Sequence, residues 1–382
     1  MMESTFQNRS ASKYPVDLNL FQIKAHNPSF QELSASMSIG QRPIKDFCVP
    51  ANPYFPNSEI MDVFLERLPF HLKYYPPSNA KIAEKLAKTL NLNPSEVVLG
   101  NGSTELITWI DRLFIDTNLI TSVPTFGRWT DQPRETGKEV ILYHRTKEHE
   151  FQIEIENFVK LARERGAKVA VISNPNNPTG ALLSKAEVQS LVEAMQNLDL
   201  IVIDESFIEF ACEFGTPTFE REAGKYSNVL VLKSLGKNFG LHGMRLGYSV
   251  GNVNLIAKLR SALPHWNING VGDLVIELFA SYQHEYESGR RHVIRDRILM
   301  EESLRSIDSL TVFPSKANFV YIQVPFDVDG VALRNRLLTD HGLFIRECGN
   351  KIGSTSNHFR IASRPTNDTA ELVSALRQSL YS

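Results

Sequence analysis

Short apolar segments alternate with amphipathic helical segments through most of this chain, and this alternation constrains its fold more than any other feature. The apolar segments are rich in Val, Ile and Leu and lie at 119–123, 140–143, 169–172, 200–203 and 229–232. Helical spacing of apolar residues predicts helices at 58–68, 79–90, 156–165 and 185–197. Strands that are apolar on both faces are typical of a sheet covered on both sides. The pattern predicts an α/β fold with a mostly parallel sheet between helices.

The C-terminal third has a different pattern. A long helical pattern runs from Leu274 to about Leu310, and shorter segments follow it: strands near 343–346 and 358–362, and helices at 331–340 and 369–380. We therefore predict three parts: an N-terminal arm at 1–50, a large domain at 51–272, and a small α+β domain at 273–382 that starts with an interdomain helix. The arm is polar and irregular, which favours packing late or against a partner subunit.

Composition narrows the possible partners and the compartment. The 382 residues carry a formal net charge of -2, so neither nucleic acid nor an anionic membrane is predicted as the main partner. The cysteines Cys48, Cys212 and Cys348 are far apart and fit neither a disulfide framework nor zinc-ligand spacing. The N-terminus lacks the apolar core of a signal peptide, and no segment approaches transmembrane length. We expect a cytoplasmic protein without a metal site.

Polar residues follow three of the predicted strands. Asn177 lies in the segment SNPNNPTG, Asp204 directly follows 200–203, and Lys237 lies in the loop after 229–232. In an open parallel sheet, ligands bind at the carboxyl ends of the strands. Each residue alone has an ordinary alternative: a turn residue for Asn177, a helix cap or solvated strand end for Asp204, and a surface lysine for Lys237. Together they predict a binding site.

One cofactor chemistry would use all three side chains. A desolvated lysine amine such as that of Lys237 can lose its proton and form a Schiff base with an aldehyde. A carboxylate such as Asp204 keeps a ring nitrogen protonated, and Asn177 can donate to a ring hydroxyl. Backbone N–H groups at a helix start, where Ser103 or Thr104 could act as the cap, and a cation would hold a phosphate. The candidate phosphate-binding residues are Gly102, Ser103, Thr104, Ser234 and Arg245. The segment NGST alone predicts only the start of an ordinary capped helix.

The pattern S-x-x-K-x-F-G-L-x-G-x-R-x-G around Lys237, the segment SNPNNPTG and the Asp204 strand resemble the signature segments of fold-type-I pyridoxal-phosphate enzymes of the class I/II aminotransferase family. The similarity runs from about residue 45 to the C-terminus. It implies pyridoxal 5'-phosphate as cofactor and a homodimer with the site at the subunit interface. It also implies that Phe126 stacks on the cofactor, that Tyr75 reaches the phosphate from the neighbouring subunit, and that Arg360 grips the substrate carboxylate. Phe207 stands where many relatives have Tyr, so one hydrogen bond to the ring hydroxyl is lost.

Details of the sequence resemble two branches of that family. The segments GNGSTELI and KYYPP are similar to histidinol-phosphate aminotransferases, whereas DFCVPANP, IRECGNKIG and a histidine in the arm, His26, lean towards threonine-phosphate decarboxylases. Both branches act on small phosphate monoesters, which implicates His26, Arg346 and Lys351 as phosphate contacts. Each has an alternative, such as a structural ion pair for Arg346 and a solvated arm residue for His26.

The main hypothesis is a pyridoxal-phosphate-dependent aminotransferase for a small, phosphate-bearing amino acid or amine. Lys237 would act as base and acid, Asp204 would stabilise the carbanionic intermediate, and Arg360 would orient the carboxylate. The first alternative keeps this site but decarboxylates an O-phospho amino acid. The second is a non-catalytic ligand-sensing domain on the same fold. The histidines His71, His242 and His265 are predicted to be packed or solvated.

Overall fold

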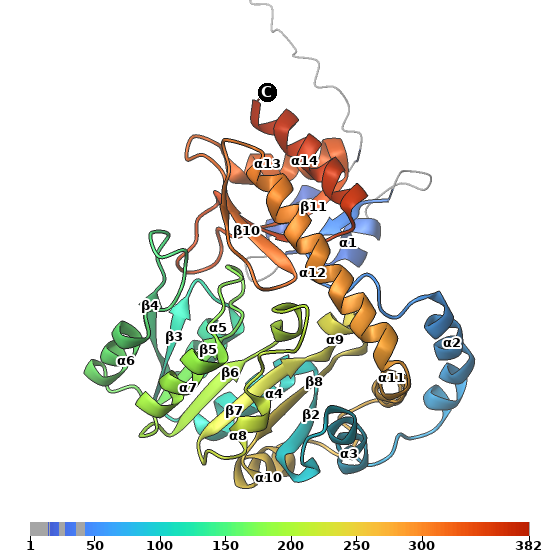
Figure 1. Ribbon diagram of the computed structural model, residues 1–382, viewed down its shortest axis with the longest axis vertical. Helices are drawn as coiled ribbons and strands as arrows, with labels where there is room; N and C mark the ends of the chain where they lie inside the picture. Colours follow the sequence, from blue (N-terminus) through green and yellow to red (C-terminus); the bar gives the residue numbers. More distant parts are fainter. Residues whose placement is uncertain (1–13, 15, 23–26, 36–42, 382) are drawn as a thin grey trace, which may run out of the picture.

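The computed structural model describes residues 14, 16–22, 27–35 and 43–381 (Figure 1). Its larger sheet has seven strands in the order β2-β8-β7-β6-β5-β3-β4. Strand β8 runs antiparallel to both of its neighbours, and the others are parallel to one another, which confirms the mostly parallel sheet. The strands are β2 Val97–Asn101, β3 Asn118–Val123, β4 Glu139–His144, β5 Val169–Ser173, β6 Leu200–Asp204, β7 Val229–Ser234 and β8 Leu246–Gly251.

Helices cover both faces of this sheet, because its strands are apolar on both sides. Along β7, Leu230 and Leu232 pack with α4 Gly102–Phe114 and α10 Val253–Ala262. Val229 and Val231 pack on the opposite face, against α6 Ile155–Glu164, α7 Lys185–Ala194 and α8 Glu220–Ala223. The edge formed by β2 and β8 is covered by α2 Ser58–Lys73, α3 Asn79–Leu90 and α11 Gly270–Ser281. Helix α5 Arg128–Glu135 packs on α4 and β4.

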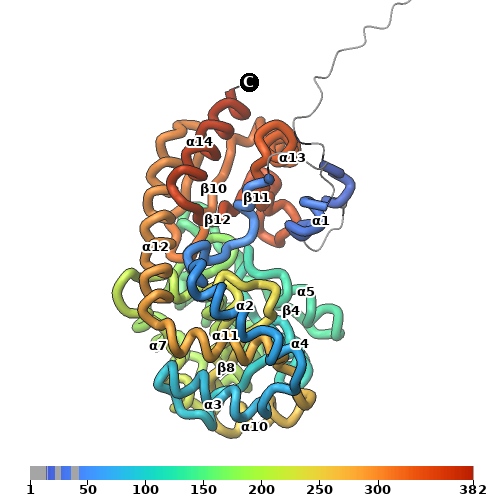
Figure 2. The backbone as a smooth tube through the Cα atoms, turned by 90° about the vertical axis from the view of Figure 1, so that its right-hand side faces the viewer, coloured from blue at the N-terminus to red at the C-terminus, as the bar shows by residue number. Residues whose placement is uncertain are grey.

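A smaller mixed sheet lies above the carboxyl ends of the large sheet (Figures 1 and 2). Its strand order is β1-β11-β12-β10-β9. Among the described strands of this sheet, β1 and β11 are the one neighbouring pair that runs parallel, and the other neighbouring pairs are antiparallel. The strands are β1 Lys45–Phe47, β9 Thr311–Phe313, β10 Phe319–Gln323, β11 Leu343–Glu347 and β12 His358–Ala362. They pack with α12 Gln283–Arg305, α13 Gly330–His341 and α14 Thr366–Tyr381.

Part of the predicted arm belongs to this smaller sheet. Strand β1 lies within residues 1–50 and pairs with β11, and it is preceded by η1 Leu18–Gln22 and α1 Phe30–Ala35. The predicted boundary at 272 falls inside α11. The division into three parts stays a prediction.

Two local expectations need correction. The helical pattern predicted from Leu274 to about Leu310 is two helices, α11 and α12, because the backbone leaves the helical conformation at Tyr282 (φ -119°, ψ 44°). The segment after β7 is not a simple loop: Lys237 lies in a one-turn helix, α9 Leu235–Asn238. Single 3-10 turns complete the chain at η2 Pro94–Glu96, η3 Ile208–Phe210 and η4 His242–Met244. No helix in the described part of the chain is long and apolar enough to cross a lipid bilayer.

Candidate active site

A cavity of about 320 Å³ lies where the carboxyl ends of the large sheet meet the smaller sheet. It is lined by Ser234 at the end of β7, by Asn177 and Lys237 in the segments that follow β5 and β7, and by Arg346 and Arg360 of the smaller sheet. A small hollow adjoins it and is lined by Asp204 together with Lys237, Asn177, Phe126 and Phe207. The three side chains that follow predicted strand ends therefore share one site.

The Lys237 amine is held among apolar and cationic groups. Its Nζ lies 4.3 Å from the centroid of the Phe207 ring, and it has no hydrogen-bond partner among the described residues. Burial lowers the pKa of Lys237 to about 8, Asp204 opposes this shift, and Arg360 and Arg245 add to it. An amine with a pKa near neutral can act as a nucleophile and can both accept and donate a proton.

Asp204 ends β6 and is only 4% exposed. Its Oδ1 accepts hydrogen bonds from the Ser206 backbone N–H at 3.1 Å and the Ser206 hydroxyl at 2.6 Å. Its Oδ2 accepts from Trp129 Nε1 at 2.8 Å. An ionised carboxylate can accept about four hydrogen bonds, so Oδ2 keeps one free position for a ligand. Sequence reasoning missed Trp129 and Ser206, although Trp129 lies only three residues after Phe126.

The start of α4 forms a cradle for an anion. The helix begins at Gly102, and no side chain caps it, so the prediction that Ser103 or Thr104 caps the helix is wrong. Both residues lie in the first turn and line the cavity. Gly102 has a φ of 75°, and a Cβ there would lie 2.6 Å from an Arg245 Nη atom. The free backbone N–H groups and the Arg245 guanidinium suit a phosphate.

Arg360 connects the two sheets through Asn177. Its Nη1 donates to Asn177 Oδ1 at 2.8 Å, and its Nη2 donates to the Cys48 carbonyl at 2.7 Å. The Asn177 oxygen is thereby occupied, which leaves the Asn177 NH₂ group to donate to a ligand. Arg360 Nε is buried and has no partner among the described residues.

Two further basic side chains line the cavity: Arg346 on β11 and Lys351 in the segment that follows this strand. Arg346 donates to Asn27 Oδ1 and to Asn350 Oδ1, the latter at 2.7 Å, and forms no ion pair with a carboxylate in the described part of the chain. Lys351 Nζ donates to the Thr125 carbonyl at 2.9 Å. Burial lowers the pKa of Lys351 to about 7, and Arg346 adds to this shift. His26 lies outside the described residues, whereas its neighbour Asn27 lines the cavity.

The cavity wall also contains His242 and Cys48, which sequence reasoning did not assign to the site. Burial and the neighbouring Lys237 lower the pKa of His242 to about 4, so its ring is uncharged at neutral pH. No local sequence pattern predicts that either residue lines the cavity, because only the tertiary fold brings them there.

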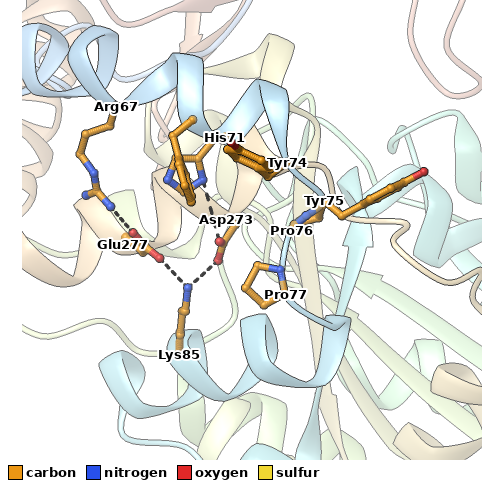
Figure 3. A pocket seen from close by; sticks show the side chains of 11 residues that line it. Arg67, His71, Tyr74, Tyr75, Pro76, Pro77, Lys85, Asp273 and Glu277 are labelled. Atoms are coloured by element: carbon orange, nitrogen blue, oxygen red, sulfur yellow. Dashed lines mark hydrogen bonds and ion pairs between the residues drawn. The ribbon is translucent and has the colours of Figure 1, made fainter.

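Tyr75 does not reach this cavity within one chain. Its side chain is 81% exposed, and its ring lies 4.8 Å from that of Trp266, measured between centroids. It lines a separate cavity of about 530 Å³ that also contains Lys85 and Asp273, whose side chains form an ion pair at 2.8 Å. Figure 3 shows the Tyr75 ring pointing away from this charged group.

Comparisons with known proteins agree with this geometry. The family model described as aminotransferase class I and II matches residues 56–377. An L-serine phosphate decarboxylase from Sulfurospirillum multivorans is 29% identical over 93% of both chains, and a histidinol-phosphate aminotransferase from Ruminiclostridium cellulolyticum is 28% identical over 81% of this chain and 84% of its own. The structure of a decarboxylase from Sulfurospirillum multivorans superposes with a TM-score of 0.84 at 29% identity, with 93% of each chain covered.

Proposed function

This chain belongs to the aminotransferase class I and II family, whose enzymes use pyridoxal 5'-phosphate, and from that premise we propose that it decarboxylates an O-phospho amino acid, with L-serine phosphate as the first candidate. The observation that carries the proposal is the charge of the cavity. Five cationic side chains line it, and no aspartate or glutamate of the described chain does: Lys237, Arg245, Arg346, Lys351 and Arg360.

This charge matches the anionic groups that must enter the cavity together. The cofactor brings a phosphate, and the proposed substrate brings a second phosphate and a carboxylate. Buried cations need anionic partners, because an uncompensated charge inside a protein is costly. Arg245 lies at the helix start that suits the cofactor phosphate, so Arg346 and Lys351 remain for the substrate phosphate and Arg360 for the carboxylate. A plain amino acid would leave Arg346 and Lys351 without an anionic partner.

The residues present fit pyridoxal phosphate at each of its polar positions. Lys237 would hold the aldehyde, Asp204 would accept from the ring nitrogen through its free Oδ2 position, and the Asn177 NH₂ would donate to the ring hydroxyl. Phe126 would cover one ring face. Phe207 offers no hydroxyl and instead packs edge-on against Phe319, so Asn177 is the donor proposed for the ring hydroxyl. The phosphate would lie in the cradle of Gly102, Ser103, Thr104, Ser234 and Arg245.

When bound, the cofactor supplies an electron sink for the pair released at the substrate Cα. The bond between Cα and the carboxylate breaks, carbon dioxide leaves, and Cα must then gain one proton. We assign this donation to Lys237, and its support is that Lys237 and Asp204 line the same small hollow. Arg360 and the pair Arg346 and Lys351 would hold the substrate from its two ends, which fixes the orientation of the bond that breaks.

Transamination, ranked first from the sequence, uses the same residues, and similarity to a histidinol-phosphate aminotransferase favours it as the second candidate. The L-serine phosphate decarboxylase is matched over a larger share of both chains, and this supports decarboxylation better. A phosphate-bearing substrate is common to both candidates.

The test is a panel of phosphorylated and plain amino acids, assayed for carbon dioxide and for amino transfer to a 2-oxo acid. We expect L-serine phosphate to give carbon dioxide and the matching amine in equal amounts, with no requirement for a 2-oxo acid. Serine without the phosphate should react poorly, because Arg346 and Lys351 lose their partner. Amino transfer without carbon dioxide would establish the aminotransferase instead, and no reaction with any member would refute both.

We also propose that the enzyme is a homodimer in which Tyr75 serves the partner's site. Large apolar or aromatic side chains that are more than half exposed gather on α2, in the loop after it and at one neighbouring position: Leu65, Phe70, Leu72, Tyr74, Tyr75 and Trp266. Exposed apolar groups of this size are typical of an interface. Arg245 is also exposed in the single chain. The phosphate cradle beside it therefore has room for a hydroxyl donor such as that of Tyr75 from a partner chain.

Mixing two inactive variants tests this arrangement. If Tyr75 serves the partner, a dimer of one Tyr75→Ala and one Lys237→Ala chain contains one intact site and one doubly defective site. Random pairing makes half of the dimers mixed, so about a quarter of all sites should be intact at limiting cofactor concentration. If mixing restores no activity while each variant remains dimeric in sedimentation, Tyr75 does not act across the interface. A monomer at assay concentration would also contradict the proposal.

A further inference from the structure

Two arginines that line the cavity lie opposite each other on neighbouring strands of the smaller sheet. Arg346 of β11 and Arg360 of β12 are direct partners in the antiparallel register, and the residues are 7% and 9% exposed. Both line the same cavity, so both side chains leave the sheet on one face. Opposite residues of an antiparallel pair have Cβ atoms about 5 Å apart, and like charges in this arrangement repel each other. The pair is therefore costly unless an anion in the cavity offsets its charge.

Two amide oxygens hold the guanidinium of Arg346. Its Nη1 donates to Asn27 Oδ1, and its Nη2 donates to Asn350 Oδ1 at 2.7 Å. Within the described ranges no carboxylate pairs with it, whereas Lys138, whose side chain is 10% exposed, pairs with Asp111 at 2.9 Å. An amide oxygen accepts from a guanidinium N–H but carries no charge that would neutralise it. Arg346 is therefore fixed in place with its positive charge available to a ligand.

Asn27 is itself fixed from the other side. Its Nδ2 donates to Cys48 Sγ at 3.5 Å, so each end of its amide has a partner within the protein. Two residues later α1 begins with a reciprocal cap, in which the Ser29 N–H donates to Glu32 Oε2 at 2.7 Å and the Glu32 N–H donates to Ser29 Oγ at 3.2 Å. Leu33 of α1 is fully buried in a cluster with residues of α13 and β11. Asn27 is thus anchored to the sheet that carries Arg346.

We propose that Asn27 is a positioning residue for phosphate recognition, which holds Arg346 in the cavity without neutralising it. The inference rests on the proposed function, in which Arg346 and Lys351 bind the substrate phosphate. A carboxylate in place of the Asn27 amide would hold the guanidinium as well, but it would compete with the phosphate for the same charge. An apolar side chain would leave the charge but would not orient it. The uncharged amide gives both orientation and charge.

The test is the binding of inorganic phosphate to the holoenzyme, in which the cofactor phosphate would occupy the cradle at Gly102. Equilibrium dialysis with radioactive phosphate gives the Kd without turnover. We expect Asn27→Asp to weaken binding by about 10-fold or more, and Asn27→Ala by about 3-fold. The matched control is Asn335→Asp on α13, where Asn335 Oδ1 likewise accepts from an arginine, Arg334, at 2.7 Å. This control should bind phosphate with the wild-type Kd.

A double variant shows whether the effect of Asn27 passes through Arg346. Arg346→Gln should itself weaken phosphate binding by about 10-fold or more, and adding Asn27→Asp should then weaken it no further. A further loss in the double variant would mean that the residue at 27 faces the phosphate directly, which would overturn the positioning role. Wild-type binding in folded Asn27→Asp, or an equal loss in Asn27→Ala, would overturn it as well.

Asn27→Ala provides the decisive measurement if Asn27→Asp does not fold. Its loss of phosphate affinity should also disappear in the Arg346→Gln background, and wild-type affinity in Asn27→Ala would then refute the proposal. In turnover, the folded Asn27 variants should raise the KM for L-serine phosphate with little change in kcat, and should leave the slow reaction of serine unchanged. A general structural defect would lower the rates with both substrates.

The binding measurement separates this inference from the proposed function. A wild-type enzyme that binds phosphate through Arg346 but releases no carbon dioxide would refute the proposed function and leave the role of Asn27 intact. Wild-type phosphate affinity in folded Arg346→Gln would refute the role of Asn27, whatever reaction the enzyme catalyses.

Discussion

Lys237→Ala protein is expected to release carbon dioxide from its substrate at less than about one ten-thousandth of the wild-type rate. General acid–base catalysis by a positioned side chain contributes about 10²–10⁴-fold, and the covalent link to the cofactor proposed for Lys237 would be lost as well. Among the residues that the structure describes, no other lysine can take its place without rearrangement, because Lys351 Nζ donates to the Thr125 carbonyl and the buried Lys233 forms ion pairs with Glu205 and Glu209. The measurement is the initial rate of carbon dioxide release at saturating cofactor.

A second measurement separates loss of chemistry from loss of fold. Borohydride should fix the cofactor on a peptide containing Lys237 in the wild type, and it should fix none in the variant. The control is Lys185→Ala, which removes a lysine that pairs with Glu222 on the surface of α7 and α8, and we expect it to retain the wild-type rate. Full activity in Lys237→Ala would remove this residue from the mechanism altogether.

The regular elements of the large domain were predictable because their signals are local. The strand expected at 169–172 is β5 Val169–Ser173, and the helix expected at 79–90 is α3 Asn79–Leu90, since apolar periodicity within a dozen residues determines each. Strand β1 Lys45–Phe47 has three residues, one of them apolar, and exists only because it pairs with β11 about 300 residues away. No local pattern predicts such a pairing.

The site was predictable in part, for the same reason. Lys237, Asp204 and Asn177 follow strands that the pattern reveals, and parallel strands bring their ends together. The partners of these residues depend on contacts distant in sequence: Trp129 donates to Asp204 across 75 residues, and Arg360 donates to Asn177 across 183. The role proposed for Tyr75 would require a second chain, so neither the sequence nor a single folded chain can establish it.

Asp204→Asn protein is expected to lose about 10²–10³-fold in kcat, the usual loss when one preorganised electrostatic group is removed from a transition state. Asparagine keeps the shape of the side chain but has no negative charge to keep a ring nitrogen protonated. Its NH₂ group would also face one of the donors that now contact the carboxylate, from Ser206 or from Trp129. Cofactor affinity should fall less than kcat, because the phosphate cradle at Gly102 is separate from this carboxylate.

Trp129→Phe gives a graded comparison for Asp204. It keeps a smaller aromatic ring in a fully buried position and removes the hydrogen bond to Oδ2, at 2.8 Å. A hydrogen bond to a charged group contributes about 1.5–3 kcal/mol, so we expect a loss of kcat of about 10-fold or more that stays below the loss in Asp204→Asn. Equal kcat in wild type and Asp204→Asn would show that the carboxylate is not the partner of the ring nitrogen. A loss in Trp129→Phe larger than in Asp204→Asn would show instead that Trp129 acts on the site independently, since a residue that works only through the Asp204 carboxylate cannot matter more than its charge.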